Sequence, residues 1–165
     1  MPTNLLKIYN QLLEIDYLSE PDRIISLKRI FKRDIEENDN FNFRSKKINP
    51  TKREGVATDI LFSHLTTIAD GKNDKKRSFE SARSRRLHWI KHLIEERKTD
   101  NMLIFSVLDP NGIRTYIYDK DEKYVIILEP YRNGLEYYLI TAYHLDGNNP
   151  DKLNRKFKRK LPEIH

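Results

Sequence analysis

Two arginines in residues 78–96 occupy positions that a helix would turn toward the protein core. On a helical wheel, Arg83 and Arg86 fall inside one apolar stripe, three residues apart. The stripe consists of Phe79, Ala82, Trp89, Ile90, Leu93 and Ile94. Because an unpaired charge in a core is very costly, two guanidinium groups one turn apart indicate a pocket for a carboxylate pair or a phosphate.

The same arginines also allow a purely structural interpretation. In that case the Arg83 side chain extends past the core into solvent, and Arg86 pairs with a glutamate. The spacing of the two residues does not favour one interpretation over the other.

Residues 135–143 are expected to form a strand that carries a small polar patch. Strict alternation places Tyr137, Leu139, Thr141 and Tyr143 on one side of this strand. The hydroxyl of Thr141 and the phenol of Tyr143 are then hydrogen-bonding groups near the end of an otherwise apolar element. Since threonine and tyrosine are common in strands, ordinary strand propensity is the alternative explanation.

The elements that would position these side chains follow from the hydrophobic pattern of residues 78–165. A helix over about residues 79–97 precedes four apolar runs with short turns between them, which favours an antiparallel meander. A last, basic helix begins at Pro150, with Asn149 as its cap. The four predicted strands are Met102–Leu108, Ile113–Tyr118, Tyr124–Glu129 and Leu135–Tyr143.

Residues 1–77 are expected to form a helical extension. Apolar spacing predicts helices over about residues 5–15, 24–35 and 54–68, with a polar loop at 38–53 and a basic connector at 69–77. The predicted fold class is therefore α+β: a helix on a four-stranded antiparallel meander sheet, a closing basic helix and an N-terminal helical extension. The pattern leaves open whether the extension is a lid, a dimerisation module or a docking surface.

Composition limits the class of protein. The 165 residues are 38% hydrophobic and 34% charged, and the net charge of +6 suits a polyanionic partner. The absence of cysteine excludes disulfides and thiolate chemistry. His88 and His92 lie one helical turn apart, but no third ligand stands out, so we expect no metal and no cofactor. Without an apolar run of roughly 18 residues or a signal-peptide layout, we expect a cytoplasmic protein.

Four segments of the second half resemble phage-encoded nucleases, in the same order and with similar gaps. RSRRLHWIKHLIE (residues 83–95) resembles their ER-x-x-R-I-x-W helix, and EKYVIIL (122–128) resembles their DYVVVL strand. YYLITAY (137–143) resembles their YLLTTAY strand, and KLNRKF (152–157) resembles their closing RRKLxREY helix. These nucleases form the phage branch of the barnase, EndoU, colicin and RelE-like ribonuclease superfamily. The resemblance covers about residues 78–160.

The resemblance implies metal-independent cleavage of RNA, with Arg83, Arg86, Thr141 and Tyr143 in the active site. In such a reaction the ribose 2′-hydroxyl attacks the phosphorus and a 2′,3′-cyclic phosphate forms. The arginines would hold the phosphate, Thr141 would orient it, and Tyr143 would donate a proton or stack on a base. His88 is a candidate acid or base, because an ordinary histidine has a pKa near about 6.5, although the helical wheel turns it away from the apolar stripe.

Five further cations are candidates for RNA binding. Four lie in the last helix and one lies in the loop before the last strand: Lys152, Arg155, Lys156 and Arg159, and Arg132. Such a charge run is also typical of an ordinary solvated helix face. The resemblance implies a toxin or phage effector, with an acidic antitoxin or immunity protein as partner. The alternatives are a nucleic-acid-binding module without catalysis and a phage structural accessory protein.

Overall fold

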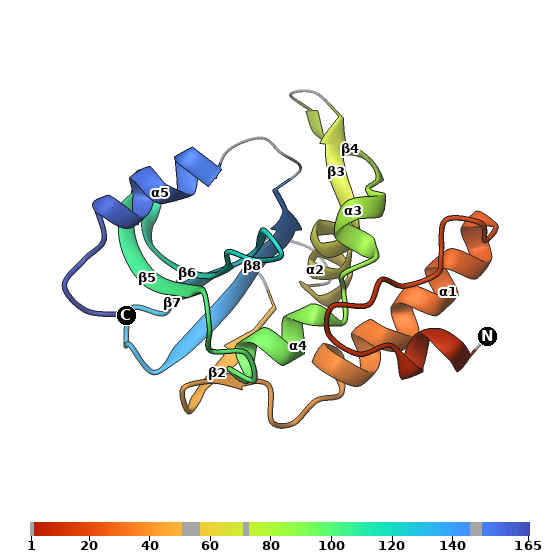
Figure 1. Ribbon diagram of the computed structural model, residues 1–165, viewed down its shortest axis with the longest axis horizontal. Coiled ribbons are helices and arrows are strands. Elements are labelled where there is room, and N and C mark those ends of the chain that lie inside the picture. Colours follow the sequence, from red (N-terminus) through yellow and green to blue (C-terminus); the bar gives the residue numbers. More distant parts are fainter. Residues whose placement is uncertain (1, 51–56, 71–72, 146–149) are drawn as a thin grey trace.

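The computed structural model describes residues 2–50, 57–70, 73–145 and 150–165 and has an α+β architecture (Figure 1). Its main sheet has six strands in the order β1-β2-β8-β7-β6-β5, and a separate two-stranded sheet pairs β3 with β4. Five α-helices lie in the described ranges. The predicted α+β class is confirmed, whereas the predicted four-stranded antiparallel sheet is too small, because the sheet is six-stranded and mixed.

Four strands of this sheet form the antiparallel meander that the sequence predicts. Each strand ends within one residue of its predicted bounds. The turn from β5 to β6 contains Gly112 with a φ of 114°, a backbone angle that glycine adopts at little cost. The strands are β5 (Met102–Asp109), β6 (Gly112–Asp119), β7 (Tyr124–Pro130) and β8 (Glu136–His144).

The other two strands come from a stretch that the sequence predicts as a loop. β1 (Asn42–Phe43) and β2 (Lys46–Asn49) lie within residues 38–53, and β2 pairs in parallel with β8. Phe43 and Ile48 are buried, so two apolar side chains anchor this edge of the sheet among polar neighbours. The loop prediction is wrong because a short, mostly polar strand at a sheet edge has no strong hydrophobic pattern.

The N-terminal segment is not the helix predicted over residues 5–15. A short 3₁₀ turn, η1 (Pro2–Leu6), is followed by an irregular chain that reaches residue 18. Asn4 holds this chain, because its Oδ1 accepts from the Glu14 main-chain N at 2.9 Å and its Nδ2 donates to Glu14 O at 3.2 Å. Leu13 is buried next to this contact. Tertiary hydrogen bonds thus replace the helix, and local periodicity does not predict them.

The next two helices agree with the sequence. α1 (Glu20–Phe31) continues into a π-helical turn, η2 (Lys32–Glu36), and together they cover the helix predicted over residues 24–35. α2 (Ala57–Thr66) matches most of the described part of the helix predicted over residues 54–68, but residues 67 and 68 belong to a strand and residues 54–56 lie outside the described ranges.

A β-hairpin follows α2, where the sequence predicts a basic connector over residues 69–77. β3 (Thr67–Asp70) and β4 (Asn73–Phe79) pair antiparallel and project from the body of the protein (Figure 1). Arg77 ties the two strands together, because its Nε donates to the Thr67 Oγ1 at 2.8 Å. The connector prediction is wrong because this hairpin is polar and lacks the apolar alternation of a half-buried strand.

The helix predicted over residues 79–97 is in fact two short helices, α3 (Ser81–Ser84) and α4 (Trp89–Ile94), joined by a turn. The carbonyl oxygen of Arg85 in this turn accepts a hydrogen bond from Leu13 N at 3.0 Å. The N-terminal segment therefore uses a main-chain group that a continuous helix would use itself. No glycine or proline marks the break, so the sequence predicts one helix.

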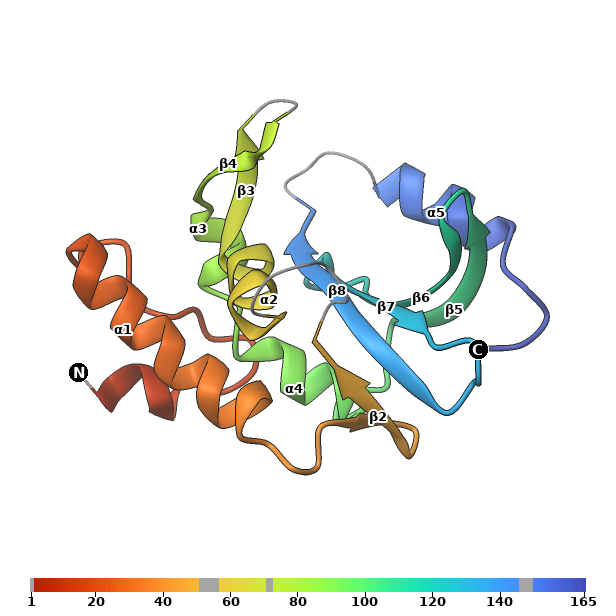
Figure 2. The same cartoon turned by 180° about the vertical axis from the view of Figure 1, so that it is seen from behind.

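The last helix, α5 (Pro150–Lys158), begins at Pro150 as predicted, while the predicted cap Asn149 lies outside the described residues. α5 packs on one face of the sheet against Phe105 and Tyr116. The opposite core joins α1, α2 and α4 to the other face. Figure 2 shows α5 at the curled β5–β6 end and the N-terminal helices at the other end. The regions 1–77 and 78–165 contribute side chains to one shared core.

Candidate functional site

Arg83 of α3 is held in place by main-chain oxygens. Its Nη1 donates to His64 O at 2.6 Å and to Thr67 O at 3.0 Å, so it bridges the last turn of α2 and the first residue of β3. The side chain is half-buried, and burial lowers the pKa of Arg83 from its ordinary value. A guanidinium nevertheless stays charged in proteins. The acceptors of its hydrogen bonds are neutral main-chain oxygens. Among the described residues Arg83 forms no salt bridge, although the charge of Glu80 acts on it and opposes the lowering of its pKa.

A second guanidinium shares one of these acceptors. Arg77 of β4 donates from Nη2 to Thr67 O at 2.8 Å, and Arg83 donates to the same oxygen. The charge of Arg77 further lowers the pKa of Arg83, as expected for two cations at close range. Two guanidinium groups that converge on one carbonyl oxygen create a local positive potential, which favours an anion beside them.

Thr141 and Tyr143 of β8 lie next to Arg83. The Thr141 hydroxyl donates to His64 O at 3.4 Å, which is also an acceptor for Arg83. The Arg83 Cζ lies 5.6 Å from the centroid of the Tyr143 ring. Arg83 and Thr141, 58 positions apart in the sequence (141 minus 83), therefore meet at the His64 carbonyl oxygen, and Tyr143 lies beside Arg83.

A β-bulge gives Thr141 its orientation. Leu139 lies opposite Leu128 and Thr141 lies opposite Ile127, so Ile140 is an extra residue in β8. Leu139 packs in the core with α4, whereas Tyr143 packs against the other core. The prediction that Tyr137, Leu139, Thr141 and Tyr143 share one side of the strand is therefore wrong for Tyr137 and Leu139, which both pack in the core with α4.

The Tyr143 phenol is suited to donate a proton. Burial raises the pKa of Tyr143 above its ordinary value, and the nearby Arg83 charge opposes this shift. The hydroxyl is consequently protonated at neutral pH, since the ordinary pKa of tyrosine is already about 10. Tyr143 can therefore act as a hydrogen-bond or proton donor to a leaving oxygen, and it is a poor proton acceptor.

Arg86 lies close to the cluster but takes different partners. Its Nη1 donates to Ala82 O at 2.6 Å within its own chain segment, and its Cζ lies 5.3 Å from the centroid of the Trp89 ring. The charges of Arg83 and Arg86 both act on the buried Tyr124 phenol, where they oppose the rise in pKa that burial causes. The two arginines are thus neighbours, but no described hydrogen bond joins both of them to one acceptor.

His88 faces the N-terminal segment. It is buried, its Nε2 lies 3.0 Å from Ile8 O, and burial lowers its pKa to about 4. The ring is therefore neutral at pH 7, and Nε2 carries the proton that the Ile8 carbonyl accepts. None of the contacts described for His88 joins it to Arg83, Thr141 or Tyr143.

The residues expected to bind RNA differ in their surroundings. Arg132, Lys152, Arg155 and Arg159 are exposed. Lys156 is half-buried and forms an ion pair with Asp109 at 2.8 Å, so this side chain is a structural link between α5 and β5.

His64 and Arg77 are the members of the cluster that sequence reasoning did not place in the catalytic site. His64 contributes a main-chain oxygen, for which side-chain patterns carry no signal. Arg77 lies in the segment expected to be a basic connector, and a hairpin prediction there would have brought it back toward Thr67.

Comparisons of the chain with known proteins find no matching family model, no matching curated protein and no matching solved structure. The described residues include no group of three or more histidine, aspartate or glutamate side chains that could hold a metal ion. No described helix has both the length and the apolar character that a membrane crossing needs.

Proposed function

We propose that the protein is a metal-independent endoribonuclease, with the phosphate of the substrate bound at the Arg77–Arg83 cluster. The observation that supports this most is the convergence of two guanidinium groups on Thr67 O, beside the hydroxyl-bearing Thr141 and Tyr143. Arg83, Thr141 and Tyr143 are also three of the residues that the resemblance to phage nucleases implies.

In the proposed reaction, the ribose 2′-oxygen forms a bond to phosphorus and the bond to the 5′-oxygen breaks. The Arg83 charge stabilises the extra negative charge on the non-bridging oxygens. Thr141 orients the phosphate, and Tyr143 supplies the proton that the leaving 5′-oxygen takes.

The proton of the 2′-hydroxyl needs an acceptor near the cluster. We propose His64 for this role, because its main chain already lies between Arg83 and Thr141 and its side chain is half-buried. His88 is a weaker candidate because its imidazole contacts Ile8 O.

The test is incubation of the purified protein with RNA in EDTA, followed by analysis of the 3′ ends. We expect 2′,3′-cyclic phosphate ends from the wild type, and a loss of roughly 100-fold or more in rate for Arg83→Gln. Arg85→Gln is the matched control, because Arg85 carries the same charge two residues away but lies 3.5 Å from Asp16. Wild-type cleavage by Arg83→Gln would refute the site.

A further variant separates main-chain from side-chain roles at His64. His64→Ala keeps the carbonyl oxygen that Arg83 and Thr141 use, so the fold of the cluster should persist. If the imidazole is the proton acceptor, this variant loses cleavage while still binding RNA.

A nucleic-acid-binding module without catalysis is the second candidate. The observation in its favour is the burial of His88, the acid or base expected from the sequence, against the N-terminal segment. This candidate predicts salt-dependent RNA binding with intact RNA after long incubation in EDTA. For a nuclease, an acidic antitoxin or immunity protein remains the predicted partner, since the net charge of +6 suits charge steering.

A further inference from the structure

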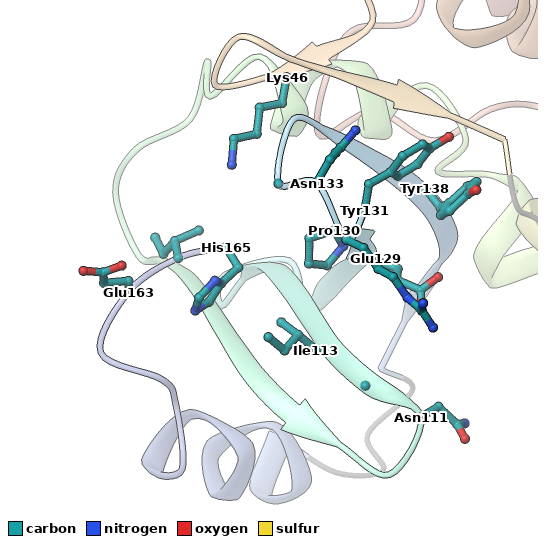
Figure 3. Close-up of a pocket in the computed structure, with 14 residues that line it drawn as sticks. Lys46, Asn111, Ile113, Glu129, Pro130, Tyr131, Asn133, Tyr138, Glu163 and His165 are labelled. Carbon is teal, nitrogen blue, oxygen red and sulfur yellow. The ribbon is translucent and has the colours of Figure 1, made fainter.

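A pocket lies where β7 turns into β8, away from the Arg83 cluster. Its volume is about 960 Å³, and Figure 3 shows side chains from the β7–β8 loop, β2, β8 and the end of the chain around it. The residues that matter here are Lys46, Glu129, Tyr131, Arg132, Asn133 and Tyr138.

Two stacked tyrosines form one wall of this pocket. The ring centroids of Tyr131 and Tyr138 are 4.2 Å apart, and their planes differ by 27° (Figure 3). Tyr131 and Tyr138 are both half-buried residues that line the pocket. Burial raises the pKa of Tyr131, and the phenol is therefore neutral. Neutral, partly exposed aromatic rings are the side chains on which nucleobases stack.

The loop that carries Tyr131 is held in a fixed shape. Tyr131 N donates to Glu136 O at 2.9 Å, and Gly134 N donates to Tyr131 O at 2.9 Å. Gly134 has a φ of 71°, the left-handed region that favours glycine. The Asn133 Oδ1 accepts from Leu135 N at 2.8 Å, which fixes the side-chain amide at the rim. The aromatic wall is therefore preorganised, which lowers the entropy cost of binding.

Charges of both signs line the pocket, and its cations lie close to the tyrosines. Arg132 is exposed at the loop, and Lys46 lies across from the tyrosines, whereas the exposed Glu163 lines the side formed by the end of the chain (Figure 3). The carboxylate of Glu129 is paired with Arg114 at 2.6 Å, so its negative charge is largely neutralised. Two cations beside an aromatic wall are the combination that single-stranded nucleic-acid sites use.

The bulge in β8 connects this pocket to the Arg83 cluster. Glu129 and Ile127 point to the same face of β7, and they lie opposite Tyr138 and Thr141. Tyr138 and Thr141 therefore lie on the same face of β8. In a regular strand, residues three positions apart would lie on opposite faces. Two residues of a strand span about 7 Å, so both sites are within reach of one short oligonucleotide.

We propose that the Tyr131–Tyr138 pocket binds one unstacked base of the RNA strand whose scissile phosphate lies at Arg83. This inference rests on the proposed function, because it assigns a base subsite to the same substrate. Arg132 and Lys46 contact the adjoining phosphates, and the aromatic wall contacts the face of the base.

The test measures the binding of labelled single-stranded 2′-deoxy oligonucleotides, which lack the 2′-hydroxyl and stay intact. We expect Tyr131→Leu to weaken binding roughly 10-fold, the effect of losing one stacked base. Tyr131→Phe should bind like the wild type, because it keeps the ring. Tyr17→Leu is the matched control, since Tyr17 is 74% exposed and is not among the residues that line the pocket.

Two further readouts separate base stacking from other effects. The slope of the logarithm of the binding constant against the logarithm of the salt concentration should be unchanged in Tyr131→Leu, because no phosphate contact is lost. In Arg83→Gln the magnitude of this slope should fall by about 1. An oligonucleotide with one abasic position should bind wild type and Tyr131→Leu equally when the missing base is the stacked one.

The outcomes distinguish the two proposals. If the wild type binds no nucleic acid, the proposed function fails and the subsite fails with it. If the wild type binds and depends on Arg83, but Tyr131→Leu binds like Tyr17→Leu, the subsite is wrong and the phosphate site stands. Loss of affinity in both Tyr131→Leu and Tyr131→Phe would also overturn base stacking.

Discussion

Replacing Arg83 by methionine measures how strongly this side chain supports the fold, independently of any activity. The guanidinium donates to His64 O at 2.6 Å and to Thr67 O at 3.0 Å, and both bonds are lost. A hydrogen bond to a charged group contributes about 1.5–3 kcal/mol. Both bonds use one nitrogen, and removing the cation relieves its repulsion from Arg77, so we expect a net loss of about 2 kcal/mol.

The assay is urea unfolding followed by the fluorescence of Trp89, the only tryptophan. Arg85→Met is the control, because Arg85 makes only a 3.4 Å contact with Leu13 O and an exposed ion pair with Asp16, together about 0.5 kcal/mol. The reasoning is refuted if Arg83→Met and Arg85→Met lose equal stability.

The same pair of variants reports on anion binding. Inorganic phosphate should raise the unfolding midpoint of the wild type and of Arg85→Met, because a ligand that binds only the folded state stabilises it. It should leave Arg83→Met unchanged. A phosphate effect that survives in Arg83→Met would place the anion elsewhere.

Three further predictions concern stability. The pKa of His88 is lowered to about 4 in the folded state, so its contribution to stability is present above pH 6.5 and lost as the pH falls toward 4. The free energy of unfolding, measured with urea, should therefore drop by up to about 3 kcal/mol in the wild type and by less in His88→Asn. Trp89→Phe should lose about 1–2 kcal/mol, because the indole N–H donates to Gln11 O at 2.9 Å, measured by circular dichroism. Arg114→Met should lower the free energy of unfolding, measured with urea, by about 3–5 kcal/mol, because it leaves the buried Glu129 carboxylate without its cation. The double variant Arg114→Met with Glu129→Gln should recover part of that loss.

The parts of the fold that depend on local pattern were predictable. Strands β5–β8 alternate clearly and are separated by short turns, so their bounds are within one residue of the prediction. α5 begins at Pro150 as predicted, whereas α1 begins at Glu20, four residues before its predicted start, with Pro21 in its first turn.

The parts that depend on distant contacts were not predictable. The N-terminal segment has helical spacing, yet Leu13 N pairs with Arg85 O, 72 positions away (85 minus 13), and both predicted helices are altered by this contact. The polar strand β2 is stabilised by its pairing with β8 and by the burial of Ile48. Neither contact can be predicted from the local sequence of β2.

For the candidate site, the spacing of residues alone predicts only part of the arrangement. Alternation alone groups Thr141 with Leu139, and the bulge at Ile140 separates them. The resemblance implies that Arg83, Arg86, Thr141 and Tyr143 lie together. Thr141 and Tyr143 do lie next to Arg83, whereas Arg86 donates to Ala82 O. Bulges are difficult to infer from one sequence because they insert a residue without changing composition.

The structural and functional interpretations of Arg83 are compatible, because what matters is the charge of its partners and not its burial alone. Arg114 is also half-buried, but Glu129 at 2.6 Å balances its charge, so Arg114 has little attraction left for an added anion. Arg83 is held by neutral carbonyl oxygens, which fix its position without cancelling its charge. The charge of Glu80 acts on Arg83, but Arg83 forms no direct ion pair among the described residues. A preorganised cation without a direct ion pair is suited to bind a phosphate, and Arg77 beside it strengthens the positive potential. We therefore expect anion affinity at Arg83 and none at Arg114.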